Sequence, residues 1–371
     1  MTQQPRLTRI ARTLLVEPGV APGASLAIAR RSAGQWRLEL GAAGFLDRRQ
    51  LAPATTKTPY DLASVTKPIF ALALARLAAR GVVDLGNALG SYLPEAAGTP
   101  SADTPLELFL AHRSGLEAHL GLFAPLCAGA PFDRRRALGA ACAARRKGAL
   151  GPAPEGGHPP VYSDLGYLLL GVVAERATGK PLDQVIAEEV TTPLGLPLYS
   201  ARQAWAHQRQ FATEVAPTEL VPWRGGVVSA VVHDENAWAL AGHGAAGHAG
   251  LFGTADAVAR FGCAVLDVLA GRAPDYLARE QVDRLVRVRP GSTLRAGFDG
   301  VSGPDSAAGA VGPRSFGHLG FTGTSVWCDP DAETVTVVLT NRVHPTRDHI
   351  SIRRARPLVQ NALLGLPGGG G

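Results

Sequence analysis

Ser64 and Lys67 stand three residues apart and could form a reactive pair. Residues 61–80 place apolar side chains on nearly every face of a helix, which predicts a buried helix. Positions i and i+3 of a helix share a face, so the lysine ammonium can reach the serine hydroxyl. Burial lowers the pKa of a lysine, and a neutral lysine can take the proton of a serine nucleophile. We therefore expect Ser64 to be a nucleophile and Lys67 its base; the alternative is a helix-edge lysine that reaches water.

Tyr162 follows a loop rich in Gly and Pro and precedes an apolar run that begins at Leu165. A tyrosine at such a junction can move protons if a nearby cation lowers its pKa from about 10. The alternative is a packed tyrosine in front of a helix that Ser163 or Asp164 caps. Taken alone, this segment does not decide between the two.

Residues 317–324 (GHLGFTGT) form a third candidate segment, just before Trp327. Glycine inside a strand often marks the close approach of another backbone or of a ligand. A main-chain N–H of this strand could help to hold an oxyanion. The alternative is a bulged strand in which His318 has no chemical role.

The elements that must position these residues follow from the pattern of apolar residues. Alternation predicts strands over residues 23–30 and 36–40, joined by a turn at 33–34, and strand character returns over 315–327 and 334–341. The N-terminus resembles a short amphipathic helix. Further helices are expected over 105–112, 167–178, 182–190, 255–270 and 351–364.

Strands at both ends of the chain, with helices between them, predict one antiparallel sheet built from the two termini. The expected fold class is therefore α/β (more narrowly α+β), in a single domain over residues 1–371. The sheet lobe would comprise about residues 1–58 and 285–367, and an all-helical lobe about 59–284. We expect residues 368–371, which are all glycine, to be a disordered tail.

Composition narrows the function. The 371 residues are 46% hydrophobic and 18% charged, which is typical of a soluble globular protein. The formal charge of +6 comes from arginine, since only four of the 37 basic residues are lysine. We do not take this arginine excess as a sign of nucleic-acid binding, so no nucleic-acid partner is expected. The four cysteines lack metal-ligand spacing, so no metal or cofactor is expected. No apolar stretch could span a membrane and no signal peptide is recognisable, so we expect a cytoplasmic location.

The three motifs together resemble those of the serine β-lactamase and penicillin-binding protein superfamily. The resemblance covers about residues 20–365 and is strongest to the branch of class C β-lactamases, D-stereospecific peptidases and related esterases. It extends to residues 110–116 (LAHRSGL), 193–196 (PLGL), 250–256 (GLFGTAD) and 339–341 (LTN). The sequence is therefore identified as a member of this superfamily, with the corresponding fold.

The resemblance implies a role for each motif residue. Ser64 would be the acylated nucleophile, Lys67 its activating partner, and Tyr162 the group that assists proton transfer. His318 and Gly320 would correspond to the K-x-G of other members, and the main-chain N–H groups of Ser64 and Phe321 would form the oxyanion hole.

Two residues depart from the pattern of the superfamily. Asp164 stands where an asparagine is usual, and His318 stands where β-lactamases usually have a lysine. Lys67 nearby should keep the pKa of His318 below its reference of about 6.5. A neutral imidazole attracts the carboxylate of a β-lactam less than an ammonium does, by about 1 kcal/mol or more. We therefore expect weak or no β-lactamase activity.

The predicted function is a cofactor-free serine hydrolase that acts through an acyl-enzyme on small ester, amide or muropeptide substrates. It would be an esterase, or an amidase or D-peptidase of peptidoglycan fragments. The alternative is a non-catalytic binding or sensor protein, which Asp164 keeps open. Residues 232–237, with His243 and His248, resemble a subgroup associated with muropeptide amidase activity. Loop packing, a substrate contact and a metal site remain open for them.

Overall fold

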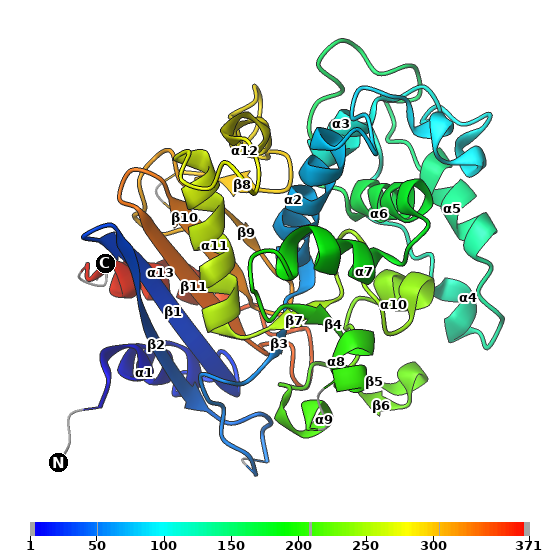
Figure 1. Ribbon diagram of the computed structural model, residues 1–371. Helices are drawn as coiled ribbons and strands as arrows, with labels where there is room; N and C mark the ends of the chain where they lie inside the picture. The colour runs from blue at the N-terminus through cyan, green and yellow to red at the C-terminus, as the bar shows by residue number, and fades with distance from the viewer. Residues whose placement is uncertain (1–3, 50, 208–209, 304, 367–371) are drawn as a thin grey trace.

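A computed structural model describes residues 4–49, 51–207, 210–303 and 305–366. A six-stranded antiparallel sheet has the strand order β2-β1-β11-β10-β9-β8 (Figure 1). Its strands are β1 (Gly23–Ser32), β2 (Gln35–Gly44), β8 (Asp299–Gly300), β9 (Phe316–Leu319), β10 (Ser325–Asp329) and β11 (Thr334–Thr340). The first strand thus pairs with the last, and the predicted antiparallel sheet from the two chain ends is confirmed.

Both faces of the sheet are covered, and β1 shows how. Its side chains alternate between the two faces, as a strand requires. Leu26 and Ile28 belong to a core with α1 (Arg6–Ala11) and α13 (Ile352–Leu364). Ala27 and Ala29 face the larger core, which includes α11 (Ala255–Leu269). The sheet is therefore a middle layer between helices.

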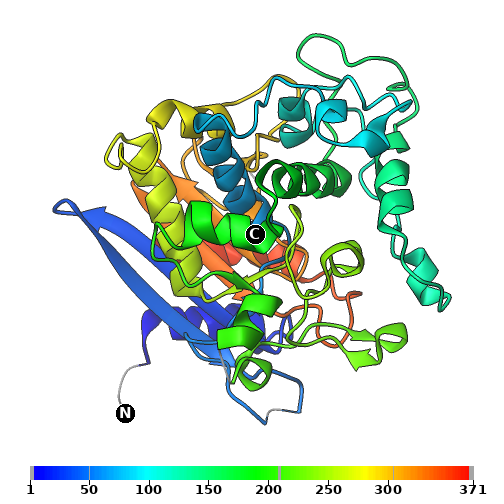
Figure 2. The same cartoon turned by 45° about the vertical axis from the view of Figure 1, so that its right-hand side comes forward.

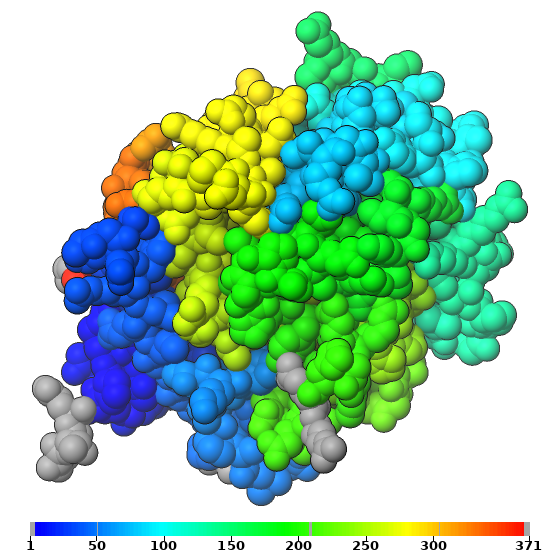
Figure 3. All heavy atoms as spheres, viewed as in Figure 1, coloured from blue at the N-terminus to red at the C-terminus, as the bar shows by residue number. Residues whose placement is uncertain are grey.

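Most of the helices between the two sets of strands form the other side of the molecule, whereas α11 and α12 (Arg279–Val286) lie on the side of the sheet (Figures 1 and 2). In the space-filling view the blue and orange ends of the chain gather on one side and the green middle on the other (Figure 3). The helices of that other side are α2 (Thr66–Ala79), α3 (Leu106–Leu110), α4 (Ala124–Cys127), α5 (Arg134–Ala143), α6 (Asp164–Thr178), α7 (Leu182–Ile186), α8 (Ala201–His207), α9 (Phe211–Glu214) and α10 (Glu235–Ala241). The helix α2 is buried almost all round, as its apolar pattern predicts.

Two short sheets complete the fold. One has the order β3-β7-β4, and the other pairs β5 with β6. The strands are β3 (Tyr60–Asp61), β4 (Tyr199–Ser200), β5 (Leu220–Val221), β6 (Gly226–Val227) and β7 (Leu251–Gly253). β3 ends directly before the segment that carries Ser64, so this small sheet fixes where that segment starts.

The prediction of strand character over residues 315–327 is wrong for the middle of this segment, which is a turn. The chain forms two strands, β9 and β10, joined by a turn in which the Gly323 amide donates to the Gly320 carbonyl at 3.1 Å. Gly323 has a φ of 100°, which L residues rarely adopt. The apolar pattern hides this turn because Phe321 lies inside it.

Other boundaries shift by a few residues. The helix expected over 61–80 begins at Thr66, and the one expected over 167–178 begins at Asp164, where the Ser163 side chain caps it. The predicted tail, 368–371, lies outside the described residues, and the division into two lobes stays a prediction. None of the described helices is long and apolar enough to cross a membrane.

Candidate active site

Ser64 lies in a 3₁₀ turn, Ala63–Val65, directly before α2. Ala63 has a φ of 47°, in the left-handed region that costs a residue with a Cβ free energy. The Ala63 amide donates to Oδ1 of the buried Asp61 at 2.8 Å. This hydrogen bond holds the strained backbone that presents the serine.

Two threonines of the β9–β10 turn bind the same segment. Thr322 Oγ1 donates to the Asp61 carbonyl at 2.8 Å, and Thr324 Oγ1 donates to the Leu62 carbonyl at 2.9 Å. A Cβ on Gly320 would lie 2.7 Å from the same Leu62 carbonyl oxygen. Glycine at 320 thus permits the close approach, and the end of β9 is held against the backbone of Ser64.

Residues of the first two motifs contact each other at the hydroxyl of Ser64. Lys67 Nζ donates to Ser64 Oγ at 2.9 Å, and the Tyr162 hydroxyl donates to the same oxygen at 2.9 Å. Lys67 is fully buried. The structure therefore brings together the predicted nucleophile and both groups expected to handle its proton.

Lys67 forms an ion pair with Asp164, whose Oδ1 lies 2.6 Å from Nζ. Burial by itself would lower the pKa of Lys67, but the Asp164 carboxylate and Tyr162 together outweigh it, and the pKa lies above its ordinary value. Burial would likewise raise the pKa of Asp164, and the Lys67 ammonium instead holds it below the usual range. The expected low pKa of Lys67 is therefore wrong, because its acidic partner lies in the same site.

Tyr162 differs from expectation in a similar way. Burial raises its pKa to about 12, although the Lys67 ammonium acts in the opposite direction. The condition under which a nearby cation lowers the tyrosine pKa is therefore not met at Tyr162. The phenol stacks on His112 at a centroid distance of 4.8 Å, and His112 Nδ1 accepts a hydrogen bond from the Ser163 amide at 3.0 Å. His112 thus holds both Tyr162 and the start of α6.

His318 lies beside Tyr162, with the two ring centroids 5.9 Å apart. Burial and then the Lys67 ammonium lower the pKa of His318 to about 3, in the direction that the sequence predicts. Its Nδ1 lies 2.8 Å from the Leu319 carbonyl. Nδ1 of the neutral ring must donate there, which leaves Nε2 as a hydrogen-bond acceptor.

The two main-chain amides predicted to form the oxyanion hole, those of Ser64 and Phe321, are both free of acceptors in the described part of the chain. The Phe321 ring is 49% exposed, lies under the Arg342 guanidinium at 4.6 Å and stacks on His233 at 5.7 Å. These contacts fix the turn that carries the Phe321 amide.

A hollow of about 470 Å³ opens above these groups, within the range of about 300–1,000 Å³ that is typical of ligand pockets. Six of the seven predicted site residues line it, namely Ser64, Tyr162, Asp164, His318, Gly320 and Phe321. The seventh, Lys67, lies buried beneath them. Four arginines from the end of β11 onward also line the hollow: Arg342, Arg347, Arg353 and Arg356.

The histidines of residues 232–248 lie mostly in closed pairs. His233 Nε2 is 2.9 Å from Glu219 Oε2, and His248 Nε2 is 2.9 Å from Asp234 Oδ1. His243 is exposed and lines a separate open depression with Arg202 and Trp205. Within the described ranges no group of three His, Cys, Asp or Glu side chains could hold a metal ion.

Several residues of the site escape sequence reasoning. Asp61, Thr322 and Thr324 position the nucleophile through main-chain contacts, which leave no periodic signal. His112 lies in the LAHRSGL segment, which the family resemblance includes, so the sequence could mark this segment as important. The contact of His112 with Tyr162 could not be predicted from the sequence.

Comparison with known proteins gives one consistent result. A family model described as Beta-lactamase matches residues 13–361. The chain is 30% identical over 319 residues to an N-acetylmuramyl-L-alanine amidase of Bacillus subtilis (strain 168), a match that covers 80% of this chain and 70% of that protein. It is 28% identical over 367 residues to a putative D-alanyl-D-alanine carboxypeptidase of Escherichia coli (strain K12), with 91% and 83% covered.

Among solved structures, a penicillin-binding protein homologue from Pyrococcus abyssi superposes with a TM-score of 0.69 at 18% identity. That match covers 98% of this chain and 78% of the homologue. The predicted β-lactamase-like fold is thereby confirmed.

Proposed function

Because this chain belongs to the Beta-lactamase family and is a serine hydrolase, we propose that it cleaves an amide bond of a small peptidoglycan fragment through an acyl-enzyme on Ser64. One observation carries the assignment of the nucleophile. Ser64 Oγ accepts hydrogen bonds from Lys67 Nζ and from the Tyr162 hydroxyl, each at 2.9 Å. A serine with two proton-handling partners at the edge of a ligand-sized hollow is the arrangement that nucleophilic catalysis requires.

In the acylation step Ser64 Oγ attacks the carbonyl carbon of the substrate. Lys67 accepts the serine proton while it passes one of its own protons to Asp164, so the lysine stays an ammonium and the carboxylate becomes a neutral acid. The 2.6 Å contact between Nζ and Oδ1 gives this proton a direct path. The amides of Ser64 and Phe321 hold the oxyanion.

Tyr162 then gives its proton to the leaving nitrogen and regains one from the Lys67–Asp164 pair. Its pKa of about 12 keeps the phenol protonated at neutral pH, as a proton donor must be. Water hydrolyses the ester through the same groups in reverse order, which restores the resting protonation. No cofactor enters these steps.

The charges around the hollow favour an anionic amide as substrate. Arg342 and Arg356 donate to main-chain carbonyls, and Arg347 binds Glu219 and Glu235. Arg353 has no acidic partner in the described chain and is exposed at the rim. Muropeptides carry free carboxylates that can pair with such an arginine. Similarity to the Bacillus subtilis amidase also supports a muropeptide amide, rather than a simple ester, as the substrate.

A reaction with a fluorophosphonate, followed by intact-mass spectrometry, tests the nucleophile. We expect one adduct per wild-type chain and none on Ser64→Ala. The alternative, a non-catalytic binding protein, requires that wild type also gives no adduct.

A panel of a muropeptide amide, a D-alanyl-D-alanine peptide, a p-nitrophenyl ester and a penicillin tests the substrate. We expect the highest kcat/KM for the muropeptide amide and the lowest for the penicillin. Cleavage of the ester alone would contradict the substrate class and leave the acyl-enzyme standing. The cytoplasmic location stays a prediction, which cell fractionation tests.

A further inference from the structure

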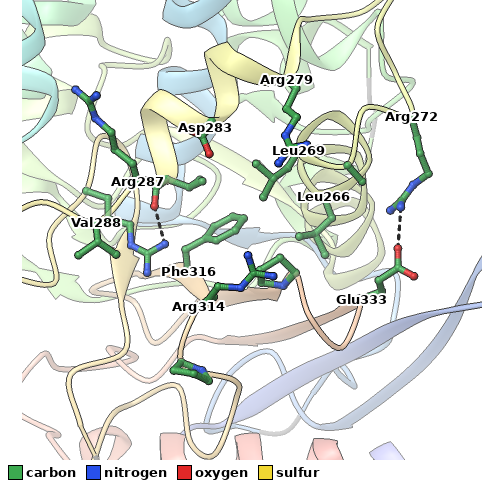
Figure 4. A pocket seen from close by; sticks show the side chains of 15 residues that line it. Leu266, Leu269, Arg272, Arg279, Asp283, Arg287, Val288, Arg314, Phe316 and Glu333 are labelled. Carbon is green, nitrogen blue, oxygen red and sulfur yellow. Dashed lines mark hydrogen bonds and ion pairs between the residues drawn. The ribbon is translucent and has the colours of Figure 1, made fainter.

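We propose that a cavity beside α12, distinct from the catalytic hollow, is a second ligand site for a small carboxylate with an apolar tail. The cavity lies between the C-terminal end of α11, α12 and the segments that flank β9 and join β10 to β11 (Figure 4). Its volume is about 390 Å³, which is also within the range of ligand pockets. It shares no lining residue with the catalytic hollow.

The floor of this cavity is apolar. Leu266 and Leu269 come from α11, Val286 from the last turn of α12, and Phe316 from β9. Figure 4 shows the two leucines and the phenyl ring converging on the same space. An aliphatic tail that packs on this floor would be removed from water, which stabilises the bound ligand by about 25 cal/mol per Å² of buried apolar area.

The rim, by contrast, is strongly basic. Five arginines line the cavity against two carboxylates: Arg272, Arg279, Arg287, Arg295 and Arg314 against Asp283 and Glu333. This excess of positive charge makes the cavity attract an anion and repel a cation.

Three of these arginines already have partners. Arg272 Nη1 pairs with Glu333 at 2.8 Å, and Arg314 binds Asp331. Arg295 donates to two main-chain carbonyls, those of Val286 and Ser315, at 2.7 and 3.0 Å. Their hydrogen-bonding groups are therefore partly used inside the protein.

The other two, Arg287 and Arg279, have no side-chain acceptor in the described part of the chain, and Arg279 is the one that lies over the apolar floor. Its guanidinium has no acceptor in the part of the chain that the structure describes, and even Asp283, one turn along α12, forms no ion pair with it. In Figure 4 its side chain extends from α12 toward Leu269, over the apolar floor. A free guanidinium above an apolar surface matches a ligand with a planar anionic head and an apolar tail.

Octanoate is a suitable probe, because it carries one carboxylate and an apolar chain. We expect saturable one-to-one binding to the full chain by isothermal titration calorimetry, equal for wild type and Ser64→Ala. Octylammonium, with the same tail and the opposite charge, should not bind. Since the assay does not involve Ser64, its failure is distinguishable from a failure of the proposed catalytic function.

Two variants locate the binding. Arg279→Gln should weaken octanoate binding by about tenfold or more, since it removes a charged hydrogen-bond donor. The matched control Arg284→Gln, an exposed arginine of the same helix that does not line the cavity, should leave the affinity unchanged. Ala270→Trp fills the cavity from the exposed end of α11 without a change of charge, and it should abolish binding.

The proposal is overturned if octanoate does not saturate, or if octylammonium binds as well as octanoate. Unchanged affinity in Arg279→Gln, or in a folded Ala270→Trp variant, would place the binding elsewhere and overturn it too.

Discussion

Two buried clusters of the molecule each pair a nitrogen base with a carboxylic acid. Only one of them has the geometry of an active site. In the candidate catalytic cluster Lys67 pairs with Asp164 and donates to the hydroxyl of Ser64. In the histidine cluster His248 pairs with Asp234, while His233 pairs with Glu219. Each cluster thus combines a nitrogen base with an acid.

The difference lies in what the pairs face. Ser64, Tyr162 and Asp164 line the hollow, whereas none of the four histidine-cluster residues does. Asp234 also caps α10 through the Ala237 amide at 2.8 Å, so its carboxylate is used twice for structure. Access of a nucleophile to a ligand-sized space, and not the types of residue, separates chemistry from packing.

The largest effect that this comparison predicts is that of Ser64→Ala. Removal of the hydroxyl should lower kcat/KM for a p-nitrophenyl ester by at least about 10³-fold and abolish the acyl-enzyme burst. The measurement is stopped-flow kinetics at several enzyme concentrations. Ser91→Ala, the same change at an exposed serine, is the control and should match wild type. Turnover by Ser64→Ala at the wild-type rate would place the chemistry elsewhere.

Asp164→Asn should have the next largest effect. The Asn side chain leaves Lys67 without its counter-charge, so burial is opposed by Tyr162 alone and the lysine pKa falls. In wild type the acid limb of kcat/KM reflects protonation of Asp164, whose pKa lies below its usual value. In the variant Lys67 itself must be neutral, and its pKa lies above that of Asp164, so the acid limb should move to higher pH. Near pH 7 kcat/KM should fall by about 10²- to 10⁴-fold.

A pH profile of both proteins tests this shift. Asp256→Asn is the matched control, because Asp256 also lies in the first turn of a helix and pairs with an arginine outside the site. An acid limb that stays in place in Asp164→Asn would show that the Lys67–Asp164 pair does not accept the serine proton.

Sequence reasoning could predict the residues of the candidate catalytic cluster because they lie in short motifs. Ser64 and Lys67 share one helical face. Tyr162 stands between a loop rich in Gly and Pro and an apolar helix, and His318 lies in a glycine-rich strand segment. The antiparallel sheet was equally predictable, since its strands alternate and stand at the two ends of the chain.

The protonation state of Lys67 was not predictable in the same way, although the lowered pKa of His318 was. Whether burial or a counter-charge decides the pKa of Lys67 depends on the 2.6 Å distance to Asp164, a residue 97 positions away. The strained Ala63 and its support by Thr322 and Thr324 depend likewise on contacts between distant segments. Pattern and spacing carry no information on such distances.

His318→Gln should have a moderate effect. The pKa of His318 is about 3, so the ring is neutral over the range of about pH 5 to 8 in which histidines usually titrate. Glutamine is also neutral, so the pH profile should keep its shape while kcat/KM falls by about tenfold. His207→Gln, at an exposed histidine of α8, is the control. Loss of an acid limb in His318→Gln alone would mean that His318 titrates in this range after all.

The smallest effect on activity is expected from the histidine cluster. Glu219 accepts from His233 and from Arg347, and His233 in turn stacks on Phe321. Glu219→Gln removes the charge that holds both partners, so the free energy of unfolding should fall by about 1–3 kcal/mol. The ester kcat/KM should change by less than about threefold, because the oxyanion turn is also held by Thr322 and Thr324.

Urea unfolding and ester kinetics on the same preparations separate the two quantities for this variant. Glu214→Gln, an exposed glutamate near the end of α9, should change neither. If Glu219→Gln keeps the wild-type free energy of unfolding but loses most of its activity, the histidine cluster takes part in the reaction. The contrast between the two clusters would then fail, because buried acid–base pairs that do not line the hollow would be acting on the chemistry through Phe321.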